Sequence, residues 1–293
     1  MKKYTFSLIL AFAVIFTCFC PIYASAYPLP AGTEVEAQSA ILYNVETDTV
    51  VYEKDADKQM EPASTTKLMT ALIVSEHVTN FDLPVTAYST VESDFTGLGA
   101  SVINIKAGEQ ISTRDLLYAL LIPSACDAAN VLAVHVSGST EKFVELMNQK
   151  AAALGMTGTH YTNAHGLAQD GLYTTARDLV ILGKEVLKNS MLAEICSKTY
   201  YEIPATNMSD VRKIFTTNYM METTSPYYYK RVKGLKTGYT EKAGRCLVSY
   251  AEKDGAEYIG VVMGCKTKDE NGNEHHYEFD DTDALLRWAF TNL

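Results

Sequence analysis

The sequence predicts an α+β protein whose antiparallel sheet is built from both ends of the chain. Strand-like segments occur near residues 40–52 and again after residue 230. Between them, apolar residues recur at the three- and four-residue spacing of helices. Strands that are grouped apart from helices, rather than alternating with them, are typical of α+β folds. We therefore expect one sheet joined from both chain ends, flanked by helices, with a helical subregion between the two strand groups.

Length and composition are those of an ordinary globular protein. The chain has 293 residues, of which 47% are hydrophobic and 20% charged, so it is long enough to bury a full core. Its formal net charge is −10. An acidic surface repels polyanions, so we expect no nucleic-acid partner and no binding to anionic lipid.

The first 26 residues resemble an export signal. Lys2 and Lys3 give a basic start, an apolar run covers residues 6–19, and Ala24 and Ala26 form a small-residue cleavage site. A retained membrane anchor is the alternative, but the run is shorter than the roughly 20 apolar residues that span a bilayer. We predict a signal peptide over residues 1–26 and a secreted mature chain over residues 27–293, without a stable membrane anchor.

The elements of the first two thirds follow from turn residues and apolar spacing. Residues 41–43 and 50–52 predict a strand hairpin that turns near residues 46–48. After Pro62, apolar residues at helical spacing predict a helix that begins near Ser64. Further helices are expected at residues 116–121, 128–136, 141–154 with Gly155 as a C-terminal cap, and 174–187 with Thr174 or Thr175 as the N-cap.

The last third returns to strands and ends in a helix. Residues 247–250 and 258–262 predict two strands joined by a tight turn at Asp254-Gly255. Apolar spacing over residues 283–290 predicts the terminal helix.

The cysteines leave the disulfide state open, and only a bridge between Cys246 and Cys265 is disfavoured by geometry. A two-residue turn at Asp254-Gly255 places position 246 opposite 263, so Cys246 and Cys265 become diagonal neighbours on one face. Such neighbours lie about 7–8 Å apart, which is long for an unstrained disulfide. The other two cysteines of the mature chain are Cys126 and Cys196, and no Cys-x-x-Cys or His-rich cluster predicts a metal site.

The first chemical motif is Ser64-x-x-Lys67. Residues three apart share one face of a helix, so this spacing places an amine beside a hydroxyl. A serine hydroxyl is a poor nucleophile unless a nearby base takes its proton, and a lysine with a lowered pKa can be that base. The motif is short, and an exposed polar first turn of a helix would give the same letters.

Two more motifs follow in the chain. Ser124-Ala125-Cys126 comes after the break at Pro123, where Ser124 could relay a proton or serve only as a helix N-cap. Lys236-Thr237-Gly238 enters a predicted strand, where a cation, a hydroxyl and a glycine can cradle a carboxylate at close range. Each motif alone is weak evidence for a function, and the evidence becomes specific only when the three motifs occur in this order.

Taken in this order, the motifs resemble the signature of penicillin-binding enzymes and serine β-lactamases. The surrounding sequence is closer to one group, the low-molecular-mass D-alanyl-D-alanine carboxypeptidases, and the likeness extends from about residue 40 to residue 290. It rests on the segments 62–71, 120–129, 147–167 and 234–244. The resemblance implies a β-lactamase-like or DD-peptidase-like fold and a serine peptidase that acts on peptidoglycan in the cell-wall space.

The resemblance also implies roles for the motif residues. Ser64 would attack the carbonyl between two D-alanines, Lys67 would take its proton, and Ser124 would help to pass the proton to the departing D-alanine. Lys236 and Thr237 would hold the terminal carboxylate. The backbone N–H groups of Ser64 and Tyr239 would form the oxyanion hole, and Gly238 and Cys126 would line the substrate site.

Partners follow from the same likeness. The implied substrate is a peptidoglycan stem peptide that ends in D-Ala-D-Ala, and β-lactams, which mimic that ending, are the implied inhibitors. The family needs neither a metal nor an organic cofactor. Many relatives continue into a β-rich domain and an amphipathic membrane helix, whereas this sequence stops at Leu293, so we expect residues 27–293 to form the catalytic domain alone.

Three positions depart from the family pattern. Cys126 stands where the family usually has Asn, Leu172 where many members have His, and Glu278 where many have an arginine that binds carboxylate. A thiol is a weak hydrogen-bonding group compared with an amide, so substrate alignment near Cys126 must differ. Arg245 is a candidate for the missing cation, although a solvated strand residue is the equal alternative.

Other residues invite a functional interpretation that we do not favour. His160 and His165 lie in a segment that resembles a structural turn, so we expect packing roles for both. The tyrosines at 227–229 could line a peptide or glycan groove, or simply pack.

Two further functions are weighed against the carboxypeptidase. A β-lactamase would need a deacylating Glu-x-x-x-Asn segment, which the sequence between the second and third motifs lacks. A catalytically silent module that binds peptidoglycan or senses β-lactams is suggested by Cys126. The intact pair of Ser64 and Lys67 argues against it.

Overall fold

The computed structural model describes residue 29 and residues 34–293. The predicted signal peptide, residues 1–26, therefore lies outside the described residues. Within the described part of the chain, none of the helices combines the length and the apolar character needed to cross a bilayer.

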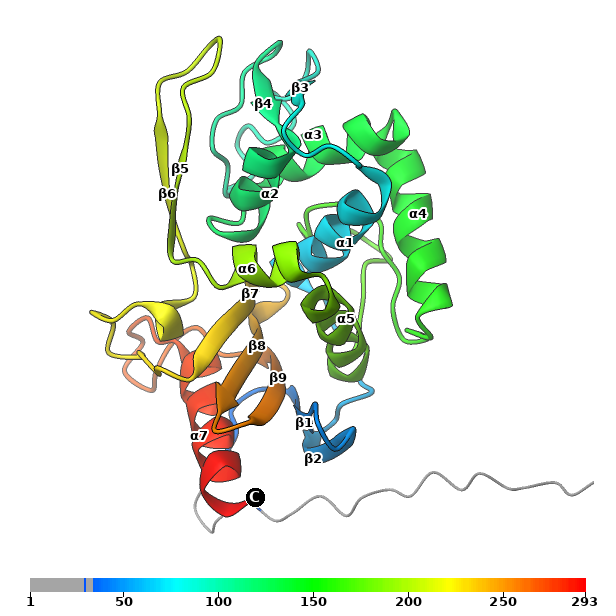
Figure 1. Ribbon diagram of the computed structural model, residues 1–293. Helices are drawn as coiled ribbons and strands as arrows, with labels where there is room; N and C mark the ends of the chain where they lie inside the picture. Colours follow the sequence, from blue (N-terminus) through cyan, green and yellow to red (C-terminus); the bar gives the residue numbers. More distant parts are fainter. Residues whose placement is uncertain (1–28, 30–33) are drawn as a thin grey trace, which may run out of the picture.

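A five-stranded antiparallel sheet forms the centre of the molecule (Figure 1). Its strand order is β2-β1-β9-β8-β7, so the first two strands of the chain continue directly into the last three. The prediction of a sheet built from both chain ends is confirmed. The strands are β1 Ser39–Asn44, β2 Thr49–Lys54, β7 Val232–Thr240, β8 Gly244–Lys253 and β9 Ala256–Cys265.

Helices cover both faces of this sheet. Helix α7 packs on β8 and β9, whereas α5 packs on β9 and β1 from the opposite side. Figure 1 shows α1 to α4 gathered into a block beyond α5, which is the predicted helical subregion. The helices are α1 Lys67–His77, α2 Thr113–Leu121, α3 Cys126–Ser137, α4 Thr140–Ala153, α5 Ala176–Lys188, α6 Ser190–Cys196 and α7 Tyr277–Asn292.

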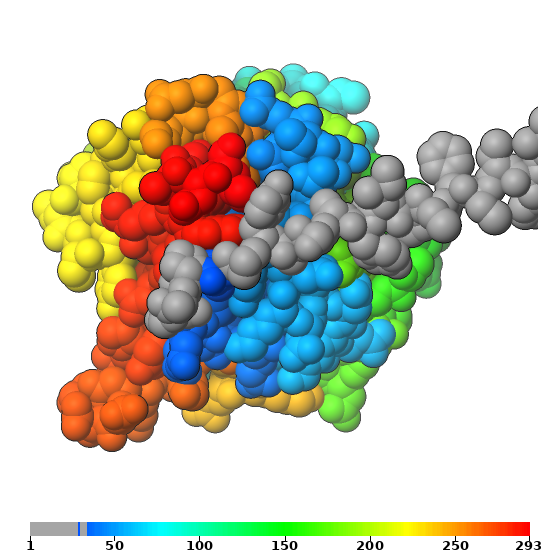
Figure 2. Space-filling model, turned by 90° about the horizontal axis from the view of Figure 1, so that it is seen from below, coloured from blue at the N-terminus to red at the C-terminus, as the bar shows by residue number. Residues whose placement is uncertain are grey.

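Side chains along each strand point alternately to the two faces of the sheet, and each face packs into its own hydrophobic core. On β1, Ile41 points into the larger core with the helical block, and Leu42 points into the smaller core with Leu286 of α7. The two chain ends are also joined by hydrogen bonds, because the backbone N–H groups of Glu36 and Ala37 donate to the Asp281 carboxylate at 2.9 and 2.7 Å. Figure 2 shows these early residues, in blue, beside the red terminal helix.

Several short elements were not predicted from the sequence. Two small hairpins pair β3 Pro84–Thr86 with β4 Gln110–Ser112, and β5 Tyr200–Ile203 with β6 Arg212–Phe215. Strands of three or four residues are too short for an alternating pattern to stand out. Two 3-10 turns, η1 Ala63–Thr66 and η2 Tyr219–Met221, also connect larger elements.

Helix α7 begins at Tyr277, six residues before the predicted start at residue 283. Its first turn carries Glu278 and Asp280 instead of a run of apolar residues. Acidic side chains stabilise a helix N-terminus electrostatically, but they conceal the apolar period on which the prediction relied.

The predicted turn at Asp254-Gly255 is confirmed, but the expected placement of the two cysteines is wrong. Leu247 pairs with Val262 as the two-residue turn requires, and the register then shifts so that Arg245 faces Cys265. Gly264 takes a φ of +69° at this bulge. The extra residue turns Cys265 into the smaller core, while Cys246 stays in the larger one. All four described cysteines are buried and free.

Candidate active site

The first site residue, Ser64, lies in the 3-10 turn that leads into α1. The Thr65 hydroxyl closes this turn by donating to the Pro62 carbonyl at 2.7 Å. The chain enters it through Ala63, whose φ is +47°. Residues of η1 lie against β7 and β8, so the turn holds Ser64 at the edge of the sheet.

Lys67 is fully buried and its amine contacts three groups. Its Nζ lies 2.9 Å from Ser64 Oγ, 3.4 Å from Cys126 Sγ and 2.6 Å from the carbonyl oxygen of His165. Burial lowers the pKa of Lys67 from its ordinary value. The amine therefore loses its proton more easily than a solvated lysine does and can accept the proton of the neighbouring hydroxyl.

The His165 carbonyl is a site group that the sequence did not reveal, because a backbone atom leaves no mark in the residue pattern. It is positioned by Asn163, whose Oδ1 accepts the N–H groups of His165 at 3.2 Å and of Gly166 at 2.6 Å. A Cβ on Gly166 would lie 1.9 Å from the Ala63 carbonyl oxygen. Only glycine allows this turn to approach the Ser64 segment so closely.

The His165 ring has a packing role, as expected. Its Nδ1 accepts the N–H of Leu167 at 3.1 Å, and the ring packs edge-on against Phe95. Burial, with a contribution from Lys67, lowers the pKa of His165 to about 3, so the imidazole is neutral near pH 7. His160 bonds the Gly171 carbonyl and does not line the cleft described below.

Ser124 is held in an unusual backbone conformation before α3. Its φ is +69°, its side chain is buried, and its Oγ has no hydrogen-bond partner. The N-cap position of α3 belongs to Ala125, so the alternative of Ser124 as an N-cap is wrong. The Ser124 hydroxyl makes no hydrogen bond to Lys67, the contact that a direct relay between the two would need. Cys126, in the first turn of α3, takes the position beside the amine.

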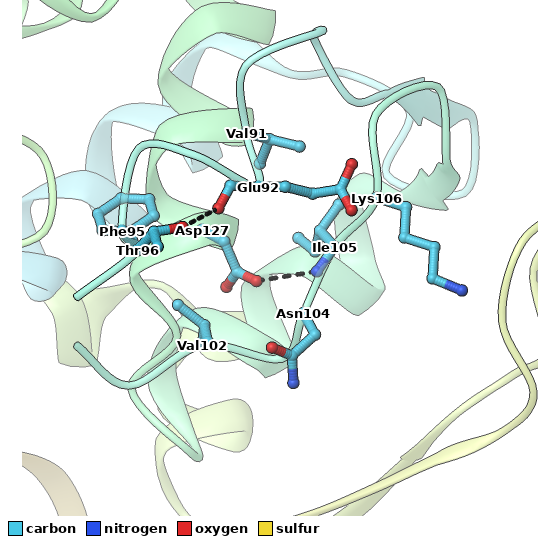
Figure 3. Close-up of a pocket in the computed structure, with 9 residues that line it drawn as sticks. All are labelled: Val91, Glu92, Phe95, Thr96, Val102, Asn104, Ile105, Lys106 and Asp127. Atoms are coloured by element: carbon cyan, nitrogen blue, oxygen red, sulfur yellow. Dashed lines mark hydrogen bonds between the residues drawn. The ribbon is translucent and has the colours of Figure 1, made fainter. Parts of the chain in front are cut away.

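The start of α3 is fixed by Asp127. Figure 3 shows its carboxylate directed at the backbone of Ile105, from which it accepts a hydrogen bond at 3.0 Å. It also accepts the N–H groups of Ile103 and Ala128. Burial raises the pKa of Asp127, and these three donors oppose that effect. The same carboxylate borders a separate cavity of about 390 Å³, which shares no lining residue with the cleft that contains Ser64.

The third motif lies on the edge strand β7. Lys236 is fully buried, and its Nζ donates to the Thr237 carbonyl at 3.0 Å. Burial and the neighbouring Lys67 lower the pKa of Lys236 to about 7. Gly238 is where the strand meets the nucleophile segment, because a Cβ there would lie 3.0 Å from the Ser64 backbone nitrogen. A larger residue would push Ser64 away from the strand.

A cleft of about 300 Å³ brings the three motifs together. Ser64, Ser124, Cys126, Thr237, Gly238 and Tyr239 all line it. The two lysines do not, since both are completely buried. The remaining lining residues come from six parts of the chain: Gly99, Ala100, Ser101, Pro123, Leu167, Thr217, Tyr219, Arg245, His276 and Glu278.

Glu278 is one of the three positions at which the sequence departs from the family pattern, and it lines the cleft. Arg245 of β8 lies beside it, with Nη1 3.7 Å from Glu278 Oε1. His276 Nδ1 lies 2.8 Å from the same oxygen. Burial raises the pKa of Glu278. Leu172, by contrast, is a core residue.

The tyrosines at 227–229 do not line the cleft. Tyr227 packs against His276 and Phe279, and Tyr229 lies under the guanidinium of Arg287. These contacts favour packing, the second of the two interpretations left open by the sequence.

Comparison with known proteins identifies the family. The model of a family described as D-alanyl-D-alanine carboxypeptidase matches residues 25–267. The DacF carboxypeptidase of Bacillus subtilis is 33% identical over 235 residues, which are 80% of this chain and 59% of that protein. DacC of Escherichia coli is 32% identical over 93% of this chain and 66% of that protein. The chain thus spans roughly three fifths to two thirds of the length of these relatives.

Solved structures of DD-peptidases also match this chain. The crystal structure of the Streptomyces K15 DD-transpeptidase superimposes with a TM-score of 0.80 at 28% identity, and the match covers 90% of this chain and 100% of that chain. Cys-to-Asn and Cys-to-Ala variants of the Streptomyces protein match comparably, with TM-scores of 0.79. A family match over most of the chain, the shared fold and the meeting of three motifs in one cleft lead to a single assignment: this chain belongs to the D-alanyl-D-alanine carboxypeptidase family.

Proposed function

We propose that the protein is a serine carboxypeptidase that removes the terminal D-alanine from peptidoglycan stem peptides through an acyl-enzyme on Ser64. The observation that carries this proposal is the buried amine of Lys67, which lies 2.9 Å from Ser64 Oγ at the edge of a substrate-sized cleft. A lysine with a lowered pKa in that position turns a weak hydroxyl into a nucleophile.

The reaction follows from the positions of these groups. Lys67 accepts the Ser64 proton while Oγ bonds to the carbonyl carbon between the two D-alanines. The backbone N–H groups of Ser64 and Tyr239 stabilise the resulting oxyanion. As the C–N bond breaks, Lys67 gives up the proton and the departing amine receives it. The hydroxyl of Ser124 lines the same cleft and has no partner of its own, so it is free to turn toward the amine and carry the proton once the peptide is bound. Water then attacks the ester, which releases the shortened peptide and restores Ser64.

Cys126 changes how the cleft holds the peptide rather than whether the reaction can occur. Its thiol contacts Lys67 at 3.4 Å but hydrogen-bonds weakly, so the peptide backbone must be aligned by other groups, among them Thr237. Cys126→Asn would restore an amide beside Lys67. We expect it to alter the rate of acylation without abolishing it.

The site of action is the space outside the cytoplasm. Residues 1–26 have the pattern of an export signal, and peptidoglycan, the proposed substrate, lies beyond the membrane. We propose that residues 27–293 act there as a catalytic domain after the signal has been removed.

The decisive experiment is intact-mass analysis after incubation with penicillin, combined with an assay for D-alanine release from a peptide that ends in D-Ala-D-Ala. Wild type should gain one stable adduct and release D-alanine. Ser64→Ala should do neither. The matched control is Ser197→Ala, an exposed serine at the end of α6, which should behave as wild type. A Ser64→Ala protein that is still labelled would refute the assignment.

The same experiment separates the two other functions. Rapid loss of the adduct with turnover of penicillin would identify a β-lactamase. Peptide binding without D-alanine release would identify a silent binding or sensing module.

A DD-transpeptidase is the second candidate, because the Streptomyces protein of that name matches over its entire length at a TM-score of 0.80. Both activities share the acyl-enzyme and differ in the group that attacks it. Adding an acceptor amine such as glycylglycine to the peptide assay decides between them. A dominant aminolysed product would favour transfer, and a dominant hydrolysed product favours the carboxypeptidase.

A further inference from the structure

We propose that Arg245 binds the terminal carboxylate of the peptide and thereby makes a free C-terminus a requirement of the site. The inference rests on the proposed function and assigns the substrate-recognition group that the departure at Glu278 leaves open. Among the described residues that line the cleft, Arg245 is the one arginine or lysine. A carboxylate that enters the cleft therefore meets this guanidinium first.

The two lysines are poorly placed for the same task. Both are completely buried, and neither lines the cleft. The amine of Lys67 is engaged with Ser64 and the His165 carbonyl, and that of Lys236 with the Thr237 carbonyl. Arginine, by contrast, keeps its charge throughout the accessible pH range and offers a fork of donors that matches a carboxylate.

The position of Arg245 fits the end of the peptide. It lies on β8 directly opposite Tyr239 of β7, while Thr237 lies two residues along β7 on the same face. Ser64 is in contact with this part of β7 through Gly238. A peptide whose scissile carbonyl is at Ser64 thus has Thr237 and Arg245 within reach of its last residue. The Tyr239 ring, 5.3 Å from the guanidinium carbon, supports the arginine from the side.

The guanidinium also has unused hydrogen-bonding capacity. Its Nε is buried and has no hydrogen-bond partner, and Oε2 of the neighbouring Glu278 has none either. The closest contact, to Glu274, is made by a carboxylate whose side chain is 74% exposed. An exposed ion pair contributes little, so a peptide carboxylate can replace Glu274 at small cost. Glu278, which is 4% exposed, remains behind as the fixed counter-ion.

The test compares two peptides that differ only at the C-terminus, one ending in the D-Ala-D-Ala carboxylate and the other in the D-Ala-D-Ala amide. The shortened peptide, which is the same product for both, is measured by mass spectrometry. Wild type should prefer the carboxylate. Arg245→Gln should raise KM for the carboxylate peptide roughly 10- to 100-fold, the usual size of a charged hydrogen-bonded contact, and leave the amide peptide within about threefold.

Two further variants and one control show whether an effect of Arg245→Gln comes from lost recognition or from a disturbed fold. Arg245→Lys keeps the charge but loses the fork, so it should retain part of the preference. Glu274→Gln removes the competing carboxylate and should lower KM for the carboxylate peptide. Arg287→Gln is the matched control, because this arginine pairs with Asp283 on α7 and does not line the cleft. It should leave both peptides unaffected.

The outcomes separate this inference from the proposed function. If Arg245→Gln slows both peptides equally, or leaves the carboxylate preference intact, Arg245 does not recognise the C-terminus. A rise in KM with Glu274→Gln would also overturn the inference. If wild type processes neither peptide and is not labelled by penicillin, it is the proposed function that fails.

Discussion

At the scale of single residues, the most consequential feature is that two lysines are buried side by side. A buried cation loses its hydration, and a second cation nearby adds repulsion, so both effects favour the neutral amine. In Lys236 they lower the pKa to about 7, and burial acts in the same direction on Lys67. The site therefore obtains a base at the cost of some stability.

Because burial lowers the pKa of Lys236, the free energy of unfolding should depend on pH. Unfolded Lys236 keeps its proton up to about pH 10.4, whereas folded Lys236 loses it above about pH 7. In that window the unfolded state binds more protons, so the contribution of Lys236 to stability rises with pH. Between pH 7.5 and 9.0 the free energy of unfolding of wild type should increase by about 2 kcal/mol relative to Lys236→Met.

Urea unfolding at the two pH values measures this difference directly. Lys233→Met, an exposed lysine on the same strand, is the matched control, and its difference from wild type should stay constant. A difference between wild type and Lys236→Met that is flat or that falls with pH would contradict the interpretation of Lys236 as a buried, easily deprotonated amine.

At the scale of elements, the turn over residues 163–167 connects the helical block to the nucleophile. Asn163 uses both ends of its amide in this turn. The oxygen accepts two backbone N–H groups, and the nitrogen donates to the Leu167 carbonyl and to Gln169 at 3.0 Å each. Because the turn carries the carbonyl that contacts Lys67, its geometry bears on acylation as well as on folding.

Removing this amide should therefore have two effects. Asn163→Ala leaves two backbone N–H groups without partners, which should lower the free energy of unfolding by about 2 to 3 kcal/mol. It should also slow acylation by penicillin, since the carbonyl that orients Lys67 loses its support. Chemical denaturation and timed intact-mass measurements test the two effects. Asn271→Ala, at an exposed loop position, should change neither, and full stability in Asn163→Ala would contradict this account.

The elements that the sequence predicted correctly have either a long apolar period or apolar runs on both sides of a clear turn. Helix α5 was expected over residues 174–187 and is found at Ala176–Lys188, capped by Thr175. The hairpin of β1 and β2 was found where the apolar runs at residues 41–43 and 50–52 placed it. The short hairpins and the bulge at Gly264 escaped prediction because their conformations depend on partners distant in the sequence, which no local pattern records.

The candidate site was predictable to the extent that it depends on side-chain motifs. The spacing of Ser64 and Lys67 placed their contact correctly, since three residues along a helical turn determine it. The role of the His165 carbonyl was missed because it belongs to the backbone. The complete burial of Lys236 was missed because it depends on how the helical block closes over β7. Tertiary packing, not local spacing, decides both.

At the scale of the whole molecule, the cleft lies where the edge of the sheet meets the helical block. Its lining comes from many separate segments, which together span most of the described chain: residues 64, 99–101, 123, 124, 126, 167, 217, 219, 237–239, 245, 276 and 278. No single element holds a complete set of reacting groups. The sheet and the helical block must therefore be docked before any of the proposed chemistry can occur.

The arrangement of the cysteines leads to a prediction about the folded protein as a whole. The bulge at Gly264 places Cys246 and Cys265 in separate cores, and all four described cysteines are free. The melting temperature of the purified protein should therefore stay within about 1 °C when a thiol reductant is added. A native cross-link is usually worth about 2–4 kcal/mol, so a drop of several degrees would reveal one and contradict the structure.

The same bulge bears on how the protein folds. A chain whose thiols are distributed between two hydrophobic layers needs no oxidant and no disulfide shuffling to become native. Its folding should proceed equally well in oxidising and reducing surroundings, with the pairing of its two ends in the central sheet as a long-range step that no disulfide assists.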